Sequence, residues 1–539
     1  MKIKLLVSIL AISILTITAC KKTKVTPTPT PEPPVVVPST GTRAELSKDS
    51  IFLYAKEMYY WNDALPTYQA FNPRSYTSAS SDLANYTNEL FAITRYKINP
   101  STGLSYEYYA PDPTDTKYSY IQDVTTKNPS AFVADQKSSV DLEGNGNDFG
   151  IRFGYYGTNA SYTIYATAIY QNSPAETAGF LRGDKITKIN GVAYGIDFPS
   201  QSSAIQTALN GTTIKLEGIN SAGTDFNITL TKAIFKSNAV YKTKVLTAGT
   251  KKIGYLAYAR FSKLTNSQPD FDAAFASFAT AGVTDLIIDL RYNGGGYIET
   301  AEYLINLIAP PSLTGTVMFT EHYNATMQNN QATILKNQPL LDANGKVQYS
   351  NAKIINLYDY MTNPYSVANN TSKFAKKGPL SGVTNVVFIV SGNTASASEL
   401  VINSLKPGLN VKLVGQTTYG KPVGFFPVTI ENKYDVYFSL FETKNSLGQG
   451  GYYTGIAPDV SASEVPANTV MYDFGNLNDN YLKLALNTLN LGVTVTGQAK
   501  TLSAAKERSL AVQSSEVINS DLGNGEFKGM IENRNRRKN

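Results

Sequence analysis

Hydrophobic residues in the second half of the chain fall into continuous runs and into stretches with helical spacing. Val383–Val390 is an unbroken apolar run rich in β-branched residues, which predicts a buried central strand. Residues 395–405 then place apolar side chains on one helical face, and a Pro-Gly pair ends the pattern. Residues 411–414 are a second short apolar run. The order predicts a strand, a helix and a strand, followed by a polar loop that contains Lys421.

Similar patterns occur on both sides of this stretch. Apolar runs at residues 253–261 and 286–290 predict strands, and the spacing of residues 271–278 predicts a helix between them. Residues 434–443 alternate like a strand, and residues 481–489 have helical spacing. A strand–helix–strand unit of this kind is typical of an α/β domain.

The first half of the chain is patterned differently. Residues 45–60 and 80–96 have helical periodicity, which predicts a small, mostly helical domain over residues 43–139. Residues 140–233 lack this helical periodicity and include an Asn-Gly pair at 190–191, which is typical of a tight turn between two strands. We therefore expect a multidomain α/β protein with a helical N-terminal domain and a separate β-rich domain.

Composition and charge narrow the range of functions. The chain has 539 residues and a net charge of +6, partly concentrated at residues 21–24 and 534–538. This is not the charge pattern of a nucleic-acid-binding surface. Cys20 is the only cysteine, so the sequence excludes an intramolecular disulfide and a cysteine-based metal site.

The first twenty residues combine a basic start, an apolar core and a cysteine. The apolar residues 5–19 are too few to span a membrane comfortably. Residues 16–20, Thr-Ile-Thr-Ala-Cys, resemble a bacterial lipoprotein cleavage box, which implies that residues 1–20 are a signal peptide ending at a lipidated Cys20. A signal anchor with an incidental cysteine is the alternative. The Pro-rich residues 21–42 predict an extended linker.

The two residues after Cys20 bear on location. Lys21 and Lys22 stand where bacterial lipoproteins retained at the inner membrane commonly have an aspartate. By resemblance to those sorting rules, we expect a lipid-anchored protein of the cell envelope, at the outer membrane. The sequence indicates neither the membrane face nor the oligomeric state.

Ser396 lies where the predicted strand gives way to the predicted helix. Because Glu399 follows three residues later, the simplest interpretation is a helix N-cap within a Ser-x-x-Glu capping box. A helix N-terminus also presents free N–H groups and the positive end of a dipole, which suit a developing oxyanion. Ser396 is therefore also a candidate nucleophile.

A nucleophilic serine needs a base. His322 is the only histidine, and nothing in its polar surroundings favours a Ser-His-Asp triad. Lys421 follows Ser396 by 25 residues. A lysine can accept a proton if burial disfavours its charged form and lowers its pKa from about 10.4 toward neutrality.

Residues 394–399, Thr-Ala-Ser-Ala-Ser-Glu, and residues 415–421, Gly-Gln-Thr-Thr-Tyr-Gly-Lys, carry a family resemblance. They resemble the active site of the C-terminal processing (tail-specific) serine proteases. The resemblance implies that Ser396 is the nucleophile and Lys421 the general base. One departure is Pro422, because the family usually has glycine after this lysine.

The same resemblance assigns the oxyanion hole. Residues 289–296 read Asp-Leu-Arg-Tyr-Asn-Gly-Gly-Gly and follow a predicted strand, where glycines let the backbone approach a ligand closely. A plain glycine loop is the alternative. The corresponding family motif implies an oxyanion N–H from Gly295 or Gly296, with Gly296 favoured, and a second donor from Ala397.

Further motifs extend the resemblance over residues 43–489. Residues 454–460, Thr-Gly-Ile-Ala-Pro-Asp-Val, match the motif that closes the family's peptidase domain, and residues 115–121 resemble its Asp-x-x-Tyr/Phe-Ser-Tyr signature. Glu399 and Thr418 are candidate supporting residues, with Thr418 orienting the lysine. The mechanism implied by the family requires no metal and no cofactor.

Residues 140–233 resemble a PDZ domain. Residues 173–186 and the Asn-Gly turn follow the PDZ pattern, and residues 203–209 predict the helix that borders its peptide-binding site. The likeness implies a carboxylate-binding loop at Phe149, Gly150, Ile151, Arg152 and Phe153, next to a strand edge that accepts a peptide. Arg152 departs from the glycine of many relatives. A module that only packs against its neighbour is the alternative.

The resemblance also divides the rest of the chain. It implies an α/β peptidase core of the crotonase/ClpP-like kind over residues 234–497. Residues 313–379 are long and polar, which predicts an insertion at the cleft rim, acting as a substrate lid. Residues 498–539 are expected to be a polar, basic and poorly ordered tail.

Three functions follow from these observations. The first is an exported, lipid-anchored serine endopeptidase that acts on proteins or peptides through a Ser396/Lys421 dyad and recognises C-terminal segments through its PDZ domain. The second is a non-catalytic PDZ scaffold that binds protein C-termini at the cell envelope. A third, a carbohydrate-binding surface lipoprotein, draws only on the 36 tyrosines.

Overall fold

The computed structural model describes residues 37–125, 140–342, 345–466, 469–489 and 528–531. All its helices and strands lie within residues 40–539, which pack as one unit, and they are described below for that unit alone. Cys20, the signal peptide over residues 1–20 and most of the 21–42 linker lie outside the described residues.

A six-stranded sheet forms the core of the α/β part of the chain. Five of its strands run parallel and the first is antiparallel. In spatial order they are β10 (Val240–Ala248), β11 (Lys251–Tyr258), β12 (Asp285–Asp289), β18 (Asn385–Val390), β19 (Asn410–Gly415) and β24 (Val460–Ser461). The predictions of strands at 253–261, 286–290, 383–390 and 411–414 are confirmed. The apolar runs are continuous because helices cover both faces of this sheet.

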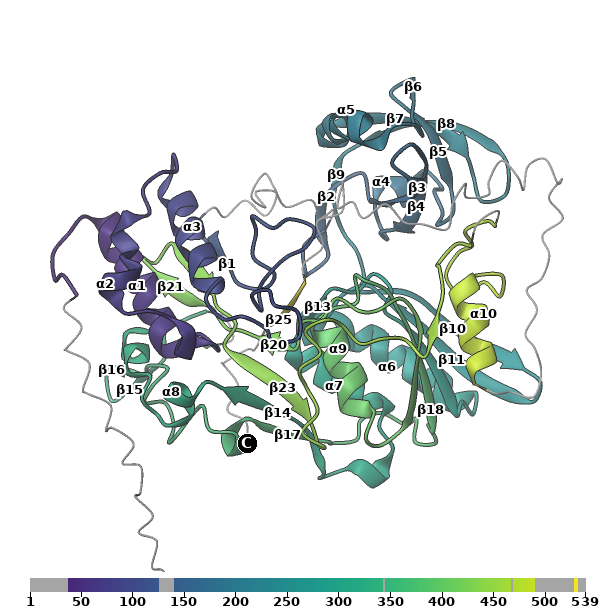
Figure 1. Cartoon of the computed structure of the whole chain (residues 1–539). Helices are drawn as coiled ribbons and strands as arrows, with labels where there is room; N and C mark the ends of the chain where they lie inside the picture. The colour runs from purple at the N-terminus through teal and green to yellow at the C-terminus, as the bar shows by residue number, and fades with distance from the viewer. Residues whose placement is uncertain (1–36, 126–139, 343–344, 467–468, 490–527, 532–539) are drawn as a thin grey trace, which may run out of the picture. The chain divides into compact units, whose positions relative to one another are not determined.

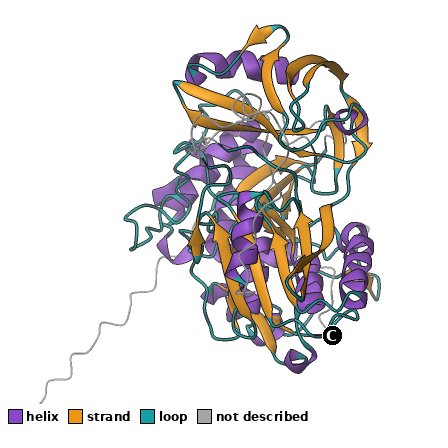
Figure 2. Ribbon diagram, turned by 90° about the vertical axis from the view of Figure 1, so that its right-hand side faces the viewer, coloured by secondary structure: helices purple, strands orange, loops and turns teal. Residues whose placement is uncertain are grey.

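Alternate residues of these strands enter two different cores. Tyr255, Ile287 and Val387 pack with Tyr481 and Leu482 of helix α10 (Asn480–Thr488). The opposite face is covered by α6 (Leu264–Thr280), α7 (Ile298–Ile308) and α9 (Ala397–Leu405), which contact one another in that order. Figure 1 shows α10 on one side of the sheet and the other three helices on its far side, and Figure 2 shows helices flanking the strands. The predicted α/β class is confirmed.

A second sheet includes strands from residues 313–379. Its order is β17 (Thr371–Lys373), β14 (Val317–Tyr323), β23 (Phe441–Asn445) and β20 (Val423–Gly424). Residues 313–379, expected to be a polar insertion, therefore supply two of its strands, and Phe319 is fully buried there. The apolar runs that form these strands are short and are separated by polar stretches, so the sequence pattern did not predict them.

The predicted single strand over residues 434–443 is two strands. β22 (Tyr434–Tyr437) pairs with β21 (Val428–Ile430) and with β1 (Tyr120–Asp123), whereas β23 belongs to the second sheet. Ser439 lies at the break, where its carbonyl accepts a hydrogen bond from the Tyr60 N–H at 2.8 Å. Alternation indicates which side chains are buried, but not that the chain changes its pairing partners midway.

The N-terminal region is helical, as the periodicity predicts. It contains α1 (Arg43–Met58), α2 (Tyr68–Phe71) and α3 (Asp82–Thr94). Thr42 caps α1, since its hydroxyl accepts a hydrogen bond from the Glu45 N–H at 3.2 Å. Phe52 and Phe71 stack with their ring centroids 4.4 Å apart, and α1 packs on α3.

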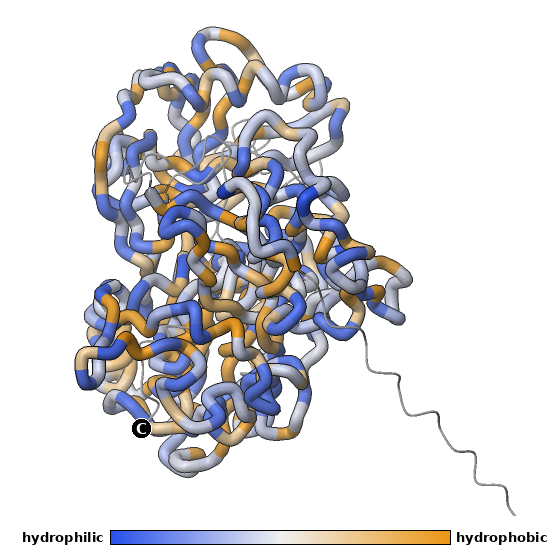
Figure 3. The backbone as a smooth tube through the Cα atoms, turned by 90° about the vertical axis from the view of Figure 1, so that its left-hand side faces the viewer, coloured by the Kyte–Doolittle hydropathy of each residue, from blue (hydrophilic) through white to orange (hydrophobic). Residues whose placement is uncertain are grey.

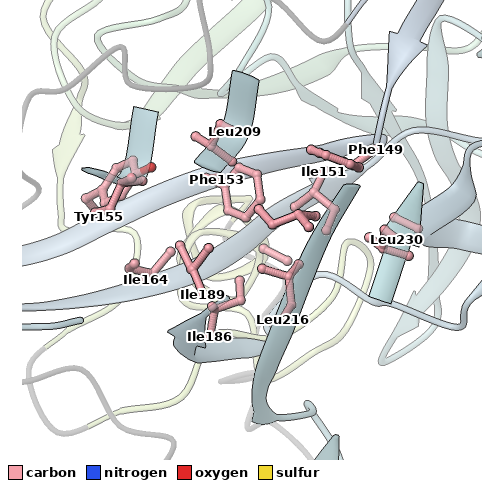
Figure 4. Close-up of a cluster of buried hydrophobic side chains, with 14 of the residues drawn as sticks. Phe149, Ile151, Phe153, Tyr155, Ile164, Ile186, Ile189, Leu209, Leu216 and Leu230 are labelled. Atoms are coloured by element: carbon pink, nitrogen blue, oxygen red, sulfur yellow. The ribbon is translucent and has the colours of Figure 1, made fainter. Parts of the chain in front are cut away.

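The β-rich domain is built around a separate sheet and core. The sheet runs β3 (Ile151–Thr158), β4 (Ser161–Ile169), β5 (Lys185–Ile189), β7 (Thr213–Ile219) and β8 (Asp225–Thr231), with β6 (Val192–Ala193) beside β5. Ile151, Phe153, Ile186 and Leu216 are among the side chains that fill its interior (Figure 4). Helices α4 (Pro174–Thr177) and α5 (Phe198–Asn210) complete it. β3 lies at the edge of this sheet, as a peptide-accepting strand must.

Over the described residues, no helix is long and apolar enough to cross a membrane. Hydrophilic and hydrophobic residues alternate over short distances along the traced chain (Figure 3).

Candidate active site

Ser396 lies in a strained turn between β18 and α9. Its φ of 60° and ψ of −109° place a non-glycine residue in a sparsely populated region, and such strain is found mainly at functional sites. The turn is fixed against the loop after β12, because the Ala395 N–H and the Ser398 hydroxyl donate to the Asn293 carbonyl at 3.1 and 3.0 Å. The serine is therefore held by the fold and not by its own side chain.

The Ser396 hydroxyl is buried and unengaged. The residue is 0% exposed, and its Oγ has no hydrogen-bond partner among the residues that the structure describes. A buried hydroxyl without a partner is costly, so a position of this kind requires an explanation. At the N-terminus of α9, it suits a nucleophile that waits for a substrate carbonyl.

Glu399 joins the serine to the lysine. Its Oε2 accepts hydrogen bonds from the Ser396 N–H and the Lys421 N–H, both at 2.8 Å. Its Oε1 accepts from the Gly420 N–H at 2.8 Å and from the Thr418 hydroxyl. One carboxylate thus holds the backbones of both predicted dyad residues. Burial raises the pKa of Glu399, and these four donors act in the opposite direction.

Thr418 acts on the site through Glu399. The resemblance predicts that Thr418 orients the lysine, whereas the structure shows its hydroxyl bonded to the Glu399 carboxylate and accepting from the Ile456 N–H at 2.7 Å. Ile456 belongs to the motif at residues 454–460. Thr418 therefore links that motif to the carboxylate that carries Ser396 and Lys421.

Lys421 is fully buried, and its ammonium group faces carbonyl oxygens and aromatic rings. Nζ donates to the Lys528 carbonyl at 2.9 Å and to the Tyr118 carbonyl at 3.4 Å, and lies 4.4 Å from the centroid of the Phe425 ring. Burial lowers the pKa of Lys421 to about 7. A substantial neutral fraction at neutral pH is what a lysine base requires.

The glycine loop lies directly against the N-terminus of α9. Gly295 and Gly296, at the start of β13 (Gly295–Tyr297), have φ values of 103° and 136°. A Cβ added to Gly295 would lie 3.0 Å from the Ala397 nitrogen, and one added to Gly296 would lie 2.0 Å from the Phe261 carbonyl oxygen. Only glycine fits at either position.

The two glycines differ as oxyanion donors. The Gly295 N–H already donates to Asn293 Oδ1 at 2.9 Å, and the Asn293 amide is anchored in turn on the Tyr258 carbonyl. Gly296 is therefore the better candidate of the two. The Ala397 N–H, in the first turn of α9, is the second candidate donor, and its residue is fully buried.

Comparison with known proteins identifies this constellation. Residues 252–462 match the profile of peptidase family S41, and residues 165–217 match that of the PDZ domain. This region is therefore similar to the peptidases of family S41. The predicted family is thereby confirmed.

Two curated proteins similar to this chain are named as carboxy-terminal processing proteases. It is 27% identical over 300 residues to the carboxy-terminal processing protease CtpA of Bacillus subtilis, covering 55% of this chain and 52% of that protein. It is 25% identical over 316 residues to the carboxyl-terminal-processing protease of Synechocystis, covering 58% of each. The chain spans about half the length of the curated relatives it matches.

A solved structure supports the fold. The putative S41 protease from Bacteroides fragilis is 20% identical and aligns over 82% of this chain and 97% of its own, with a TM-score of 0.51. This likeness shows that the two chains share a multidomain α/β fold.

Sequence reasoning missed several residues around the S41 site. Tyr118 donates from its hydroxyl to the Gly420 carbonyl at 2.6 Å, besides accepting from Lys421. Lys117 is mostly buried beside it, and burial lowers its pKa to about 8. Glu107 is fully buried and accepts from the Ser119 N–H at 2.8 Å. The signature at residues 115–121 is the signal that points to this segment.

Arg291 of the Asp-Leu-Arg motif forms a buried ionic cluster with the PDZ domain. Its guanidinium contacts Asp289, Glu464 and Asp479 at 2.7–3.1 Å. Arg182 of the PDZ domain contacts the same Glu464 at 2.7 Å. Although burial alone would raise the pKa of Glu464, the two guanidinium groups lower it to about 2. The cluster fixes the PDZ domain next to the loop that carries the glycines.

The predicted carboxylate-binding loop is only partly open to a ligand. Phe149, Ile151 and Phe153 fill the PDZ core, and the Gly150 N–H donates to Asp148 Oδ1 at 3.1 Å. Arg152 points the other way, with its guanidinium carbon 4.0 Å from the centroid of the Tyr292 ring. In this arrangement Arg152 connects the PDZ edge to the glycine loop.

His322 contacts a residue that is not part of the candidate dyad. It lies in β14 of the second sheet, and its Nε2 is 2.9 Å from the Thr320 hydroxyl. Burial lowers its pKa. Within the described ranges, no group of three or more His, Cys, Asp or Glu side chains is arranged to hold a metal ion.

Proposed function

We propose that this chain is a serine endopeptidase that cleaves proteins or peptides with a Ser396/Lys421 dyad. The observation that carries the proposal is the shared carboxylate of Glu399, which holds the backbones of a buried, unengaged serine and a buried lysine. The S41 match and the names of the curated relatives support the same reaction class.

The proposed reaction uses these groups in turn. Ser396 Oγ attacks the substrate carbonyl, neutral Lys421 takes its proton, and the N–H groups of Gly296 and Ala397 stabilise the oxyanion. The protonated lysine then returns the proton to the leaving amine, and water releases the acyl group from the serine. A pKa of about 7 lets Lys421 perform both transfers near neutral pH.

Substrate recognition is assigned to the PDZ domain. Its strand β3 lies at the edge of the sheet, and the loop at residues 149–153 precedes and begins that strand. We assign to this edge the capture of extended C-terminal segments, with the peptide adding as a further strand. The Gly150 N–H is engaged by Asp148, so carboxylate capture at the loop requires that bond to open.

Membrane attachment completes the proposal. The apolar segment at residues 5–19 followed by Cys20 supports an exported protein that is lipid-anchored at the outer membrane. Cys20→Ser should move the protein to the soluble fraction or leave it uncleaved. Wild-type fractionation and maturation of this variant would remove the anchor from the proposal.

One experiment tests the enzymatic proposal. The wild-type protein and Ser396→Ala are incubated with a library of peptides in matched free-acid and amidated forms, and the cut sites are mapped by mass spectrometry. We expect cleavage by the wild-type protein only, with free acids preferred. Peptide binding without any cleavage would instead support the non-catalytic scaffold, and equal handling of acids and amides would remove carboxylate capture.

A further inference from the structure

A short strand near the end of the sequence lies inside the candidate active site. β25 (Gly529–Ile531) pairs in parallel with β13, so that Gly295 faces Gly529 and Gly296 faces Met530. Figure 1 shows β25 beside β13 and β20. Residues 498–539 were expected to be a polar, poorly ordered tail, and for residues 528–531 that expectation is wrong.

Backbone hydrogen bonds hold this strand on both sides. The Gly529 N–H donates to the Gly294 carbonyl at 3.0 Å, and the Met530 carbonyl accepts from the Phe425 N–H at 3.0 Å. Gly294 belongs to the glycine loop, and Phe425 follows β20 in the segment after Lys421. The strand thus lies between the two segments that supply the oxyanion donors and the base. Main-chain hydrogen bonds of this kind bind an extended peptide that adds to a sheet as a further strand.

The strand also contacts the groups assigned to catalysis. The Lys528 carbonyl accepts the hydrogen bond from Lys421 Nζ at 2.9 Å, whereas Ser396 Oγ has no partner in the described structure. A Cβ built on Gly295 would lie 2.5 Å from the Gly529 carbonyl oxygen and 3.0 Å from the Ala397 nitrogen. The Gly529 carbonyl therefore lies at the N-terminus of α9, close to the position expected for the reacting carbonyl.

The side chains of Lys528 and Met530 have different surroundings. Met530 is 0% exposed. Lys528 places its Nζ 4.7 Å from the centroid of the Tyr419 ring, next to Gly420 and Lys421. A fully buried methionine marks a position that accepts a long, unbranched apolar side chain. Glycine before it lets the backbone pass close to Gly295.

We propose that the space between β13 and Phe425 is the binding site for the substrate backbone, and that residues 528–531 of this chain occupy it as an intramolecular competitor. The inhibitory consequence rests on the proposed peptidase function, whereas the binding site does not. The ligand class is an extended peptide with a small residue followed by an apolar, methionine-like residue. Because the competitor is part of the same chain, its effective concentration does not fall on dilution.

In the occupied state Lys421 Nζ donates to the Lys528 and Tyr118 carbonyls, and Ser396 Oγ has no partner among the described residues. A substrate must displace residues 528–531, which frees Lys421 Nζ from the Lys528 carbonyl and lets it reach Ser396 Oγ. Weakening the strand should therefore raise the affinity for an added peptide and the rate of cleavage together.

The test uses the full chain with Met530→Asp, which places a charge at a fully buried position. In the Ser396→Ala background, binding of a fluorescent peptide with the sequence of residues 526–533, Glu-Phe-Lys-Gly-Met-Ile-Glu-Asn, is measured by anisotropy. We expect at least tenfold tighter binding to Met530→Asp than to the unchanged strand. Met361→Asp, at a methionine that is 39% exposed, is the matched control and should leave the affinity unchanged.

A second variant and a second readout make the outcome decisive. Gly529→Pro removes the N–H that donates to Gly294 and should act like Met530→Asp, with thermal unfolding confirming that each variant is folded. With Ser396 restored, both variants should raise kcat/KM for an unrelated peptide at least tenfold. Peptide affinity within twofold of the unchanged chain in both folded variants would overturn the proposal. Tighter peptide binding with no cleavage by any variant would leave the binding site standing and overturn the peptidase function instead.

Discussion

Two buried cations near the same glycine loop behave in opposite ways. Arg291 is 1% exposed and contacts three carboxylates, those of Asp289, Glu464 and Asp479. Lys421 is 0% exposed, and its Nζ contacts carbonyl oxygens and an aromatic ring. Although burial alone would lower the pKa of Arg291, the carboxylates raise it, whereas burial lowers the pKa of Lys421 to about 7.

The hydrogen bonds of Glu399 contribute to this difference. Glu399 directs its oxygens at three backbone N–H groups and the Thr418 hydroxyl, and the described structure records no ion pair between it and Lys421 Nζ. A buried cation paired with carboxylates stays charged and holds domains together. A buried cation that contacts only carbonyl oxygens can lose its proton. The comparison thus separates a structural charge from one suited to proton transfer.

The largest change in the stability of the fold is expected from removing the charge of Arg291. Arg291→Met leaves the carboxylates of Asp289 and Asp479 buried without their main partner, which should destabilise the fold by about 3–5 kcal/mol. Lys97→Met removes the exposed pair with Asp63 and should change stability by less than about 1 kcal/mol. Thermal unfolding of both variants checks this, and equal shifts would show that the Arg291 cluster is not structural.

Replacing Lys421 should instead raise the stability of the fold. The pKa of Lys421 is about 7 in the folded chain and near 10.5 in the unfolded chain, so the unfolded state binds more protons between these pH values. Burying Lys421 therefore costs stability at neutral pH, and this cost falls as the pH rises toward 10.5. Lys421→Met should raise stability at pH 7 by roughly 2–4 kcal/mol while abolishing cleavage.

The pH dependence of the stabilisation by Lys421→Met tests its physical cause. The stabilisation by Lys421→Met should shrink markedly between pH 7 and pH 10, as measured by thermal unfolding at both values. A variant that is less stable than the wild-type protein at pH 7 would mean that Lys421 is charged and well paired in the folded state.

The smallest effect is expected at the only histidine. The His322 Nε2 atom is 2.9 Å from the Thr320 hydroxyl in the second sheet, and no described hydrogen bond joins His322 to Ser396, Glu399 or Lys421. His322→Ala should therefore keep kcat/KM within about twofold of the wild-type value. A loss of a hundredfold or more in a folded variant would make His322 part of the catalytic machinery.

The sequence predicted the strands, helices and site residues whose positions depend on local patterns. The continuous run at residues 383–390 and the helical spacing after it placed Ser396 at a strand–helix junction. The glycines at 295 and 296 are required by positive φ values and close backbone contacts, so their motif is readable without a structure. The strands of the six-stranded sheet were predictable because burial on both faces makes them continuously apolar.

The sequence was uninformative where pairing is between distant segments. β25 has three residues in a polar and basic stretch, and only the apolar pair Met530-Ile531 hints at a strand. The break at Ser439 and the strands within residues 313–379 depend on partners far along the chain. The position of Tyr118 beside Lys421 likewise depends on a contact across 303 residues.

The central claim is that Lys421 acts as a neutral base. The most direct measurement is the pH dependence of kcat/KM for the wild-type protein, Lys421→Arg and His322→Ala with one peptide substrate. We predict a limb that rises with a midpoint near pH 7 in the wild-type protein and in His322→Ala, and a loss of at least a hundredfold in Lys421→Arg, because arginine stays protonated. A wild-type limb in Lys421→Arg, together with its loss in His322→Ala, would contradict the account.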